Sequence, residues 1–477
     1  MPIRNGQQYV TGLLDGREVW IDGKRVTEVP WHPAFRNAVQ TLASLYDMQS
    51  DPELTDDLTY ESPATGDRVA TAFMHPRSVE DVLKRGRAYR LMAERTGGLM
   101  GRSPDFMNTH LTSMAAAPAF FAQNDPRFGD NIVRYYEHVR ERDLSLTHVL
   151  IDPYGDRSKG PAEQDDPDWY LRIVDETKDG LIVRGAMMVA TLGPLADELL
   201  VYRARPLTEK DRDYSMAFAI PVATPGVKLL CRESFDRGQR RIDSPLSSRF
   251  DEMDASLLFQ DVLVPWPRVF LKKDPLLGNR MRAETVMMPH VVHQTSVRAT
   301  VKAQLVLGVA SLMTEYLGTN GLSSVQEKLG ELVGYVELLK ACVRAAELDA
   351  RPTASGVYAP AGDPILAARD SFLWMYPRMI EVLQQLGSAA LIPVVSEDDL
   401  QGPLSELVQR YFRGVGVSAR DKLALFRLAW ELAVDVFGSR QVLYERFYAG
   451  TASTLLTQHY QAYDRSAAVD IVRRLLK

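Results

Sequence analysis

Cysteine is nearly absent from this chain: Cys231 and Cys342 are the two in 477 residues, and they lie far apart in the sequence. Two thiols cannot build a disulfide framework, an iron–sulfur cluster or a cysteine-based zinc site. Free thiols suit a reducing compartment, and the first residues (MPIRNGQQ) carry no apolar segment typical of a signal peptide. We therefore expect a cytoplasmic protein.

Other absences narrow the function further. No apolar run is long enough to cross a bilayer, and acidic residues outnumber basic ones by 62 to 56, so neither a membrane partner nor a nucleic-acid partner is expected. The sequence has no G-x-G-x-x-G after a strand, no P-loop, no H-E-x-x-H and no G-x-S-x-G. What is present is an ordinary globular composition, 45% hydrophobic and 25% charged, long enough for two or three domains.

The hydrophobic pattern changes twice along the chain. Residues 1–145 are mainly of helical type, with a hairpin signal at Asp22-Gly23 and a helix that Ser78 opens and Gly97-Gly98 closes. Residues 146–275 contain short β-rich segments separated by Gly, Pro and charged turns, which predicts an antiparallel sheet domain. The strands are expected at 181–184, 198–202, 216–220, 227–231 and 257–264.

Helical periodicity returns from residue 276 to the C-terminus. A stripe of apolar residues between Val325 and Val343 is typical of a bundle helix, and further helices are expected at 367–387, 404–412 and 421–437. The predicted fold is therefore of the α+β class. It has an N-terminal mainly helical domain (1–145), a central antiparallel β domain (146–275) and a C-terminal helical bundle (276–477).

Arg102 is the first candidate for chemistry. Ser103, Pro104 and Asp105 suit the N-cap and first turn of a helix, so Arg102 lies just outside a helix N-terminus. It points toward whatever that end of the helix faces. The sequence also allows a simpler role, in which Arg102 pairs with a surface carboxylate.

A second candidate is the apolar run at 149–151, which follows His148 and leads into the turn 152–156, then Arg157 and Ser158. Proline fixes φ and glycine accepts positive φ, so this segment bends. A bend that presents backbone N–H groups beside an arginine can hold a phosphate or the edge of a flavin. A core histidine followed by a solvated turn is the alternative that the spacing leaves open.

His290 and His293 have the i, i+3 spacing that brings two imidazoles onto one helix face. A metal would need a third ligand, and no acidic residue or cysteine lies nearby in the sequence. We therefore expect packed, hydrogen-bonded histidines here and no metal site.

Short segments spread over nearly the whole chain carry a more specific signal: GRSPDF at 101–106, LTHV at 146–149, GAMMVAT at 185–191, FQDVLVPW at 259–266, HVVHQ at 290–294 and LYERFYAG at 443–450. In this order they resemble the 4-hydroxyphenylacetate 3-monooxygenase family. The resemblance implies an acyl-CoA dehydrogenase-like fold, with flavin between the β domain and the bundle. It also implies the oxygenase component of a two-component aromatic hydroxylase, assembled as a homotetramer.

In such an enzyme a separate flavin reductase supplies FAD in its reduced form, FADH2, by diffusion. The flavin C4a-hydroperoxide formed with O2 then hydroxylates a phenol, 4-hydroxyphenylacetate or a similar compound, ortho to its hydroxyl. The resemblance implies that Arg102 and His148 are catalytic and that Arg102, Phe106 and His148 bind the substrate. Its implied cofactor-binding residues are His148, Val149, Leu150, Tyr154, Gly155, Asp156, Arg157, Thr191, Gly450, Thr451, Ala452 and Ser453.

Phe106 departs from the family, which often has tyrosine at this position, so the exact phenol stays open. Three other functions remain possible. A 4-hydroxybutyryl-CoA dehydratase of this fold would need cysteine ligands for an iron–sulfur cluster, which this chain lacks. An acyl-CoA dehydrogenase would need a catalytic carboxylate late in the chain, for which Glu445 is placed. A non-catalytic flavin-binding protein would have no use for both Arg102 and His148.

Overall fold

Local signals in the N-terminal region produce the helices that the sequence predicts. The computed structural model describes residues 3–477. In it Ser78 accepts a hydrogen bond from the backbone N–H of Asp81 (3.2 Å) and opens α4 (Val79–Arg95), after which Gly97 and Gly98 take positive φ. The other helices here are α1 (Gly6–Gly12), α2 (Arg36–Asp47), α3 (Thr55–Leu58), α5 (Pro104–Ala115), α6 (Pro118–Ala122) and α7 (Pro126–Arg140).

Helix α5 is the element that carries Arg102 at its start, and each of its residues is buried. It begins at the predicted N-cap, Ser103, although the Ser103 side chain makes no capping bond. A helix that is buried on all sides packs against several neighbours at once. α5 does so against α7, β5 and the long bundle helix α10 (Met287–Leu317), so it forms the link between the three regions of the chain.

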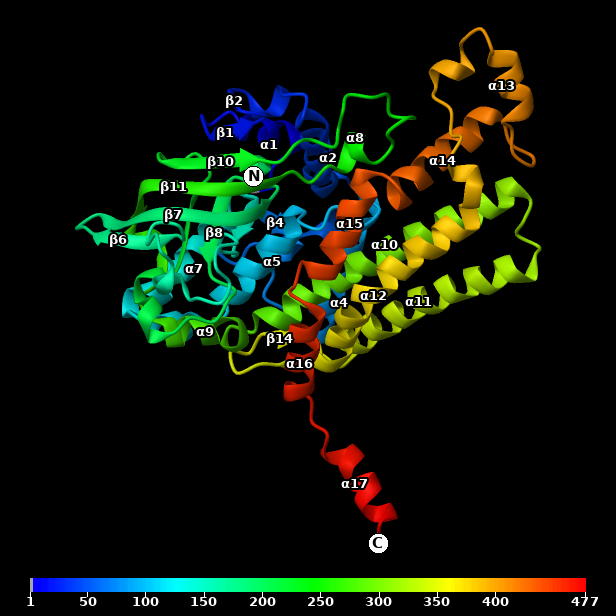
Figure 1. Ribbon diagram of the computed structural model, residues 1–477. Coiled ribbons are helices and arrows are strands. Elements are labelled where there is room, and N and C mark those ends of the chain that lie inside the picture. The colour runs from blue at the N-terminus through cyan, green and yellow to red at the C-terminus, as the bar shows by residue number, and fades with distance from the viewer. Residues whose placement is uncertain (1–2) are drawn as a thin grey trace.

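Two β-sheets form the central region (Figure 1). The larger has the order β2 (Lys24–Val26), β1 (Glu18–Ile21), β10 (Val227–Cys231), β11 (Asp254–Pro265), β7 (Gly180–Thr191), β6 (Arg172–Glu176). The smaller has the order β12 (Val269–Lys272), β9 (Met216–Pro221), β8 (Glu198–Tyr202), β5 (Leu146–Val149). Short pairs form elsewhere, β3 (Thr59–Glu61) with β4 (Arg68–Ala70) and β13 (Arg351–Pro352) with β14 (Tyr358–Ala359).

The strand directions differ in part from the predicted antiparallel arrangement. Most neighbouring strands are antiparallel, but β1 pairs with β10 and β5 pairs with β8 in parallel, so both sheets are mixed. The reason is connectivity: β1 and β5 follow helical segments and join strands distant in the chain, so no tight hairpin imposes an antiparallel direction. Asp22 and Gly23, both with positive φ, do form the predicted hairpin turn between β1 and β2.

The C-terminal region is helical, as predicted. It contains α9 (Pro275–Glu284), α10, α11 (Ser323–Leu348), α12 (Gly362–Gly387), α13 (Ser405–Tyr411), α14 (Ala419–Ala433), α15 (Val436–Phe447), α16 (Ala452–Ala462) and α17 (Ser466–Leu475); α8 (Ser247–Phe250) is a short helix of the central region. The single helix predicted over 421–437 is wrong: the chain leaves helical geometry at Val434, and Asp435 caps α15 by accepting from the backbone N–H of Val436 (2.6 Å).

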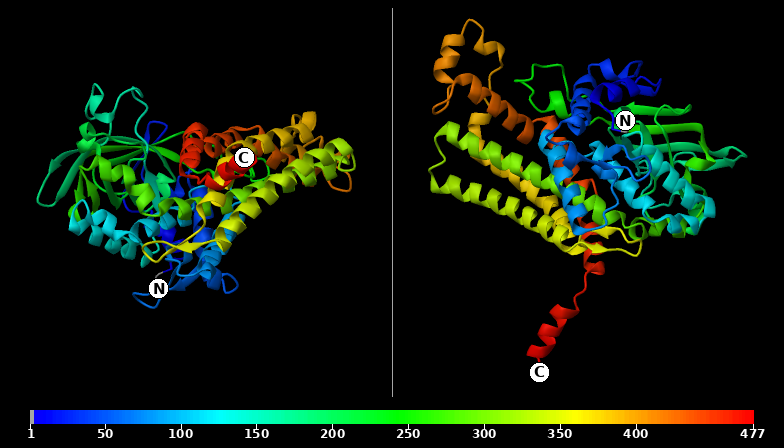
Figure 2. Two further views of the ribbon diagram at one scale, coloured as in Figure 1. Left: turned by 90° about the horizontal axis from the view of Figure 1, so that it is seen from below. Right: turned by 180° about the vertical axis from the view of Figure 1, so that it is seen from behind.

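The long helices α10, α11 and α12 lie side by side, α16 packs against α12, and α17 extends away from the body of the molecule (Figures 1 and 2). Within residues 3–477, no helix is both long and apolar enough to pass through a membrane. The order of a helical region, a β region and a helical bundle is the predicted one. The domain limits 1–145, 146–275 and 276–477 stay a prediction, because β1 and β2 join the central sheet although they belong to the first segment.

Candidate active site

Arg102 is buried inside the protein, and no carboxylate of residues 3–477 forms an ion pair with its guanidinium. Its backbone N–H donates to Glu252 Oε1 (2.7 Å), and its Nη1 donates to the hydroxyl of Tyr444 on α15. The guanidinium carbon lies 4.0 Å from the ring centre of Phe106, 5.1 Å from that of Tyr444 and 5.5 Å from that of Tyr448. Its Nε is buried without a hydrogen-bond partner. Three aromatic rings therefore hold a cation that keeps unused donor capacity.

His148 lies on β5, a strand with all four residues buried. Its imidazole packs edge-to-face against Phe106, with ring centres 6.3 Å apart, and its Nδ1 is buried without a partner. Burial, reinforced by the positive charge of Arg102, lowers the pKa of His148 well below its ordinary value. His148 is thus a neutral imidazole at pH 7, able to accept a proton in a dry environment.

Phe106 contacts two histidines. Besides His148, it packs edge-to-face against His110, one helical turn further along α5, at 5.8 Å. His110 Nε2 lies 2.5 Å from the hydroxyl of Tyr202 on β8, and its Nδ1 is buried without a partner. The structure therefore brings the predicted substrate-binding residues Arg102, Phe106 and His148 together and adds two residues beside them.

The turn that follows β5 is exposed from Tyr154 onward, and it offers a cation while two of its backbone donors are engaged. Gly155 N–H donates to the carbonyl of Pro153 (2.9 Å), and Asp156 N–H donates to Gln164 Oε1 (3.3 Å), so these two groups are already engaged. The guanidinium of Arg157 remains available to a ligand: it lies 5.5 Å from the ring centre of the exposed Tyr154. In the described part of the chain no carboxylate lies within ion-pair distance of Arg157.

The remaining cofactor-binding candidates lie at three places near this cluster. Val149 and Leu150 continue the chain from His148, and Leu150 accepts from the backbone N–H of Ala204 (3.1 Å). Thr191 ends β7: its carbonyl accepts from the hydroxyl of Thr147 (2.7 Å), next to His148, and its own hydroxyl donates to Asp254 Oδ1 (2.8 Å).

Residues 450–453 begin two residues after Tyr448, which packs over Arg102. Gly450 has φ 130°, and Thr451 caps α16 by accepting from the backbone N–H of Thr454 (3.3 Å), while Ala452 and Ser453 form the first turn. This segment is largely exposed. No hydrogen bond or ion pair between described residues joins it to the turn 154–157, so the flavin candidates form separate groups around the Arg102–His148 cluster.

Glu445 does not have the properties of a catalytic base. Its carboxylate accepts from Arg298 at 2.7 and 2.9 Å and from Lys302 at 2.7 Å, and the three side chains are almost fully buried. Burial alone would raise the pKa of Glu445, but the two cations lower it to about 2. The carboxylate needed by the acyl-CoA dehydrogenase alternative is therefore tied up in ion pairs.

The two histidines of α10 are buried and paired with other residues. His290 Nδ1 lies 3.3 Å from Arg85 Nη1, and His293 Nε2 lies 3.0 Å from Glu347 Oε1. Residues 3–477 contain no group of three or more His, Cys, Asp or Glu side chains arranged to hold a metal ion. The pair is thus hydrogen-bonded within the core, as the sequence favoured.

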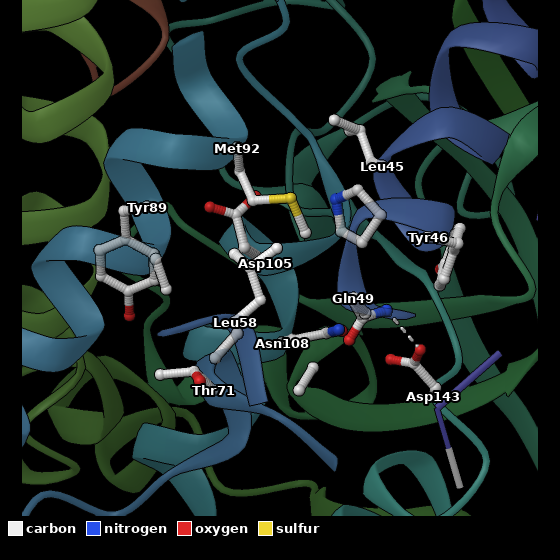
Figure 3. Close-up of a pocket in the computed structure, with 14 residues that line it drawn as sticks. Leu45, Tyr46, Gln49, Leu58, Thr71, Tyr89, Met92, Asp105, Asn108 and Asp143 are labelled. Carbon is white, nitrogen blue, oxygen red and sulfur yellow. Dashed lines mark hydrogen bonds between the residues drawn. The ribbon is translucent and has the colours of Figure 1, made fainter. Parts of the chain in front are cut away.

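A narrow cavity lies beside α5 (Figure 3), and neither Arg102 nor His148 lines it. Asp105 and Asn108 of α5 line it together with Tyr89, Gln49 and Asp143, and Gln49 Nε2 donates to Asp143 Oδ2 (2.8 Å). None of the predicted site residues lines this cavity. α5 therefore separates two polar clusters within one core.

Sequence reasoning missed Tyr444, Tyr448, His110 and Tyr202. His110 follows Phe106 by four residues on a predicted helix, so its position on the same face was available from spacing alone. The two tyrosines of α15 lie inside the segment 443–450 that carries the family resemblance, but nothing local indicates that they reach Arg102. Tyr202 gives no such signal, since it ends a strand far from α5 in the sequence.

Comparison with known sequences decides the family. A profile described as "4-hydroxyphenylacetate 3-hydroxylase N terminal" matches residues 5–271, and one described as "4-hydroxyphenylacetate 3-hydroxylase C terminal" matches residues 279–477. The chain belongs to the 4-hydroxyphenylacetate 3-hydroxylase family. The resemblance carried by the short segments is thereby confirmed over the whole chain.

Relatives in this family are similar along their full length. The chain is 38% identical to the oxygenase component of 4-hydroxyphenylacetate 3-monooxygenase from Thermus thermophilus, covering 99% of this chain and 97% of that one. A crystal structure of such an oxygenase component, complexed with FAD and 4-hydroxyphenylacetate, superposes with a TM-score of 0.95 at 38% identity, covering 99% and 98% of the two chains.

A protein of another function shares this fold. An archaeal 4-hydroxybutyryl-CoA dehydratase from N. maritimus, 23% identical, superposes with a TM-score of 0.89 over 99% of this chain and 95% of its own. At that identity the likeness concerns the fold alone. The expected order of helical region, sheets and bundle is confirmed.

Proposed function

We propose that the chain is the oxygenase component of a two-component monooxygenase that uses FADH2 to hydroxylate a 4-substituted phenol, such as 4-hydroxyphenylacetate, ortho to its hydroxyl. The observation that carries the proposal is the Arg102–Phe106–His148 cluster in a full-length member of the 4-hydroxyphenylacetate 3-hydroxylase family. Reduced FAD, delivered by a separate flavin reductase, supplies the oxygen-activating chemistry when bound.

The residues present fit a flavin and a phenol. Arg102 Nε and His148 Nδ1 are buried polar atoms without partners, and leaving such a group unsatisfied costs about 1–3 kcal/mol each. A ligand whose oxygens reach these atoms would recover that energy. At the exposed turn the unpaired Arg157 suits a flavin phosphate.

Residues 148–150, 154–157, 191 and 450–453 form the proposed flavin-binding set. They come from β5, the turn after it, the end of β7 and the segment before α16. Support comes from their position around Arg102 and His148: Thr191 bonds to the neighbour of His148, and 450–453 follows directly after Tyr448.

Each substrate-binding residue has a distinct role in the proposal. Neutral His148 accepts or shares the proton of the phenol hydroxyl, which makes the ring more electron-rich and more reactive toward an electrophilic oxygen. Arg102 stabilises the resulting phenolate without titrating itself. Phe106 forms an apolar wall beside the ring, and burial of all three residues keeps water away from the reaction.

The test is a single-turnover reaction of the purified protein with reduced FAD, O2 and 4-hydroxyphenylacetate. We expect His148→Ala to bind flavin but to lose about two to four powers of ten in hydroxylation rate, with hydrogen peroxide released in place of product. His138→Ala is the matched control, because His138 stacks on Tyr135 on α7, outside the cluster. If His148→Ala forms product as efficiently as the parent, His148 is a structural histidine.

A second variant tests the effect of Phe106, which stands where the family often has tyrosine. Phe106→Tyr restores a hydroxyl between His148 and His110, and we expect it to improve turnover of simple 4-substituted phenols. Unchanged KM and kcat across a panel of such phenols would show that the ring at this position does not face the substrate.

The proposal includes a homotetramer in the cytoplasm. Helices α15, α16 and α17 leave large apolar side chains exposed, among them Leu443, Phe447, Tyr460 and Leu475, and α17 extends away from the rest of the chain (Figure 1). Surfaces of this kind are usually covered by a partner. Light scattering should give the mass of four chains, and a stable monomer at micromolar concentration would contradict the assembly.

A further inference from the structure

A second polar group lies against Phe106, where His110 packs one helical turn further along α5. The hydroxyl of Tyr202 is 2.5 Å from His110 Nε2 and 3.6 Å from the sulfur of Met287, at the start of α10. Burial raises the pKa of Tyr202 to about 12, so its hydroxyl keeps its proton, and both His110 Nε2 and the sulfur of Met287 lie within reach of that proton. His110 Nδ1 is buried without a hydrogen-bond partner; when Nε2 accepts from Tyr202, the proton of the neutral imidazole is on Nδ1.

Arg282 adds an unpaired cation to this group. It lies at the end of α9, half-buried, and its Nη2 contacts the sulfur of Met288 at 3.4 Å, next to Met287. Along the described chain, no carboxylate lies within 4.0 Å of its guanidinium, whereas Arg280 on the same helix pairs with Glu284 at 2.7 Å. Burial, with the charges of Arg282 and Arg102, lowers the pKa of His110 to about 3.

The connection between α9 and α10 is strained. Val286 has φ 56° and ψ 20°, a left-handed conformation that a β-branched residue adopts at a cost, and it directly precedes Met287. Strain of this kind persists where the surrounding structure fixes it, often at ligand sites. Here it sets the start of α10, and with it Met287 and Met288, against Tyr202 and Arg282.

From these contacts we infer that Arg282 and the Nδ1–H of His110 bind an anionic substituent of the substrate, a carboxylate carried para to the phenol hydroxyl. This inference rests on the proposed function, in which the hydroxyl lies at Arg102 and His148. Phe106 packs against both His148 and His110, so a phenol ring that packs on Phe106 would lie beside both groups.

Arg102 and Arg282 differ in their contacts. At the hydroxyl end Arg102 is engaged with Tyr444 and three aromatic rings, which fixes its place. Among residues 3–477, the one hydrogen-bond acceptor that Arg282 contacts is a thioether sulfur, so its guanidinium is free for a carboxylate. Met287 and Met288 between them supply an apolar, adaptable surface for the linking carbons.

The experiment compares 4-hydroxyphenylacetate with 4-hydroxyphenylacetamide, its neutral isostere, on the flavin-loaded protein. Equilibrium dissociation constants are measured by anaerobic calorimetry, and KM and kcat are measured with O2. We expect the parent to bind the acid about ten- to a hundred-fold more tightly than the amide, as for a charge-assisted hydrogen bond. Arg282→Gln should lose this preference, Arg282→Lys should keep part of it, and Arg280→Gln should keep all of it.

The outcomes separate this inference from the proposed function. Equal preference for the acid in the parent and in Arg282→Gln, with both proteins hydroxylating the phenol, would overturn the inference and leave the function standing. Failure of the parent to hydroxylate either phenol would overturn both. A rise in the dissociation constant for the acid alone, with kcat nearly unchanged, is the result that supports recognition of the carboxylate by Arg282.

Discussion

Removing the carboxylate of Glu445 is the most direct test of the packing beneath the proposed active site. Glu445 lies next to Tyr444, which holds Arg102, and it is the only carboxylate hydrogen-bonded to Arg298 and Lys302 among the described residues. Lowering its pKa from 4.5 to about 2 is worth about 3 kcal/mol of stability. That contribution is complete above pH 4.5 and is lost as pH falls toward 2.

Glu445→Gln keeps the shape of the side chain but leaves two buried cations facing an amide. Breaking a buried ion pair by removing one partner costs about 3–5 kcal/mol, so we expect a loss of this size at pH 7. Lys302 can relieve part of it by releasing its proton. Its pKa is already lowered to about 8 by burial, in spite of Glu445, and without the carboxylate it falls further.

Because Lys302 can lose its proton in Glu445→Gln, the loss of stability in this variant depends on pH. Between the lowered pKa in the folded state and the ordinary value of 10.5, the unfolded chain binds more protons at Lys302, so stability rises with pH. The parent gains from this effect only above about pH 8, whereas the variant gains already at lower pH. The difference in stability between the two should therefore shrink between pH 7 and pH 9.

Urea unfolding followed by tryptophan fluorescence at pH 7 and pH 9 measures both effects. Glu337→Gln is the control, because Glu337 forms an exposed pair with Lys340 (2.7 Å) and its loss should change stability by less than about 0.5 kcal/mol. An unfolding midpoint for Glu445→Gln equal to that of the parent would refute the reasoning. A loss that is the same at both pH values would refute the role assigned to Lys302.

Two further predictions follow from the same contacts. A Cβ at Gly101 would collide with the ring of Tyr444, so Gly101→Ala should displace Tyr444 from Arg102 and lower hydroxylation at least ten-fold while flavin still binds; unchanged single-turnover rates would contradict this. Burial lowers the pKa of four largely buried histidines below 6.5 (His75, His110, His148 and His290), so the unfolded state binds more protons below that pH. Unfolding titrations should show these four lowering stability by up to about 5 kcal/mol per pH unit as pH drops, and a flat profile from pH 6.5 to 5 would count against neutral buried imidazoles.

The sequence by itself determined the features that depend on neighbouring residues. Ser78 caps α4, Gly97 and Gly98 end it, and Asp22-Gly23 turns the first hairpin, because each of these signals acts within a few residues of backbone. The order of helical, β and helical regions follows in the same way from a change in hydrophobic period. The family could also be predicted from the sequence, because the resemblance lies in short segments of consecutive residues.

The tertiary structure decided which of these segments meet. Arg102 and Tyr444 are 342 positions apart, yet the arginine donates to the tyrosine hydroxyl, and His148 reaches Phe106 only because β5 packs against α5. Likewise Glu445 has the position of a base in the sequence, but its burial with Arg298 and Lys302 makes it a structural anion. Such contacts are fixed by the packing of distant elements around one core, so the local backbone preferences of the chain do not predict them.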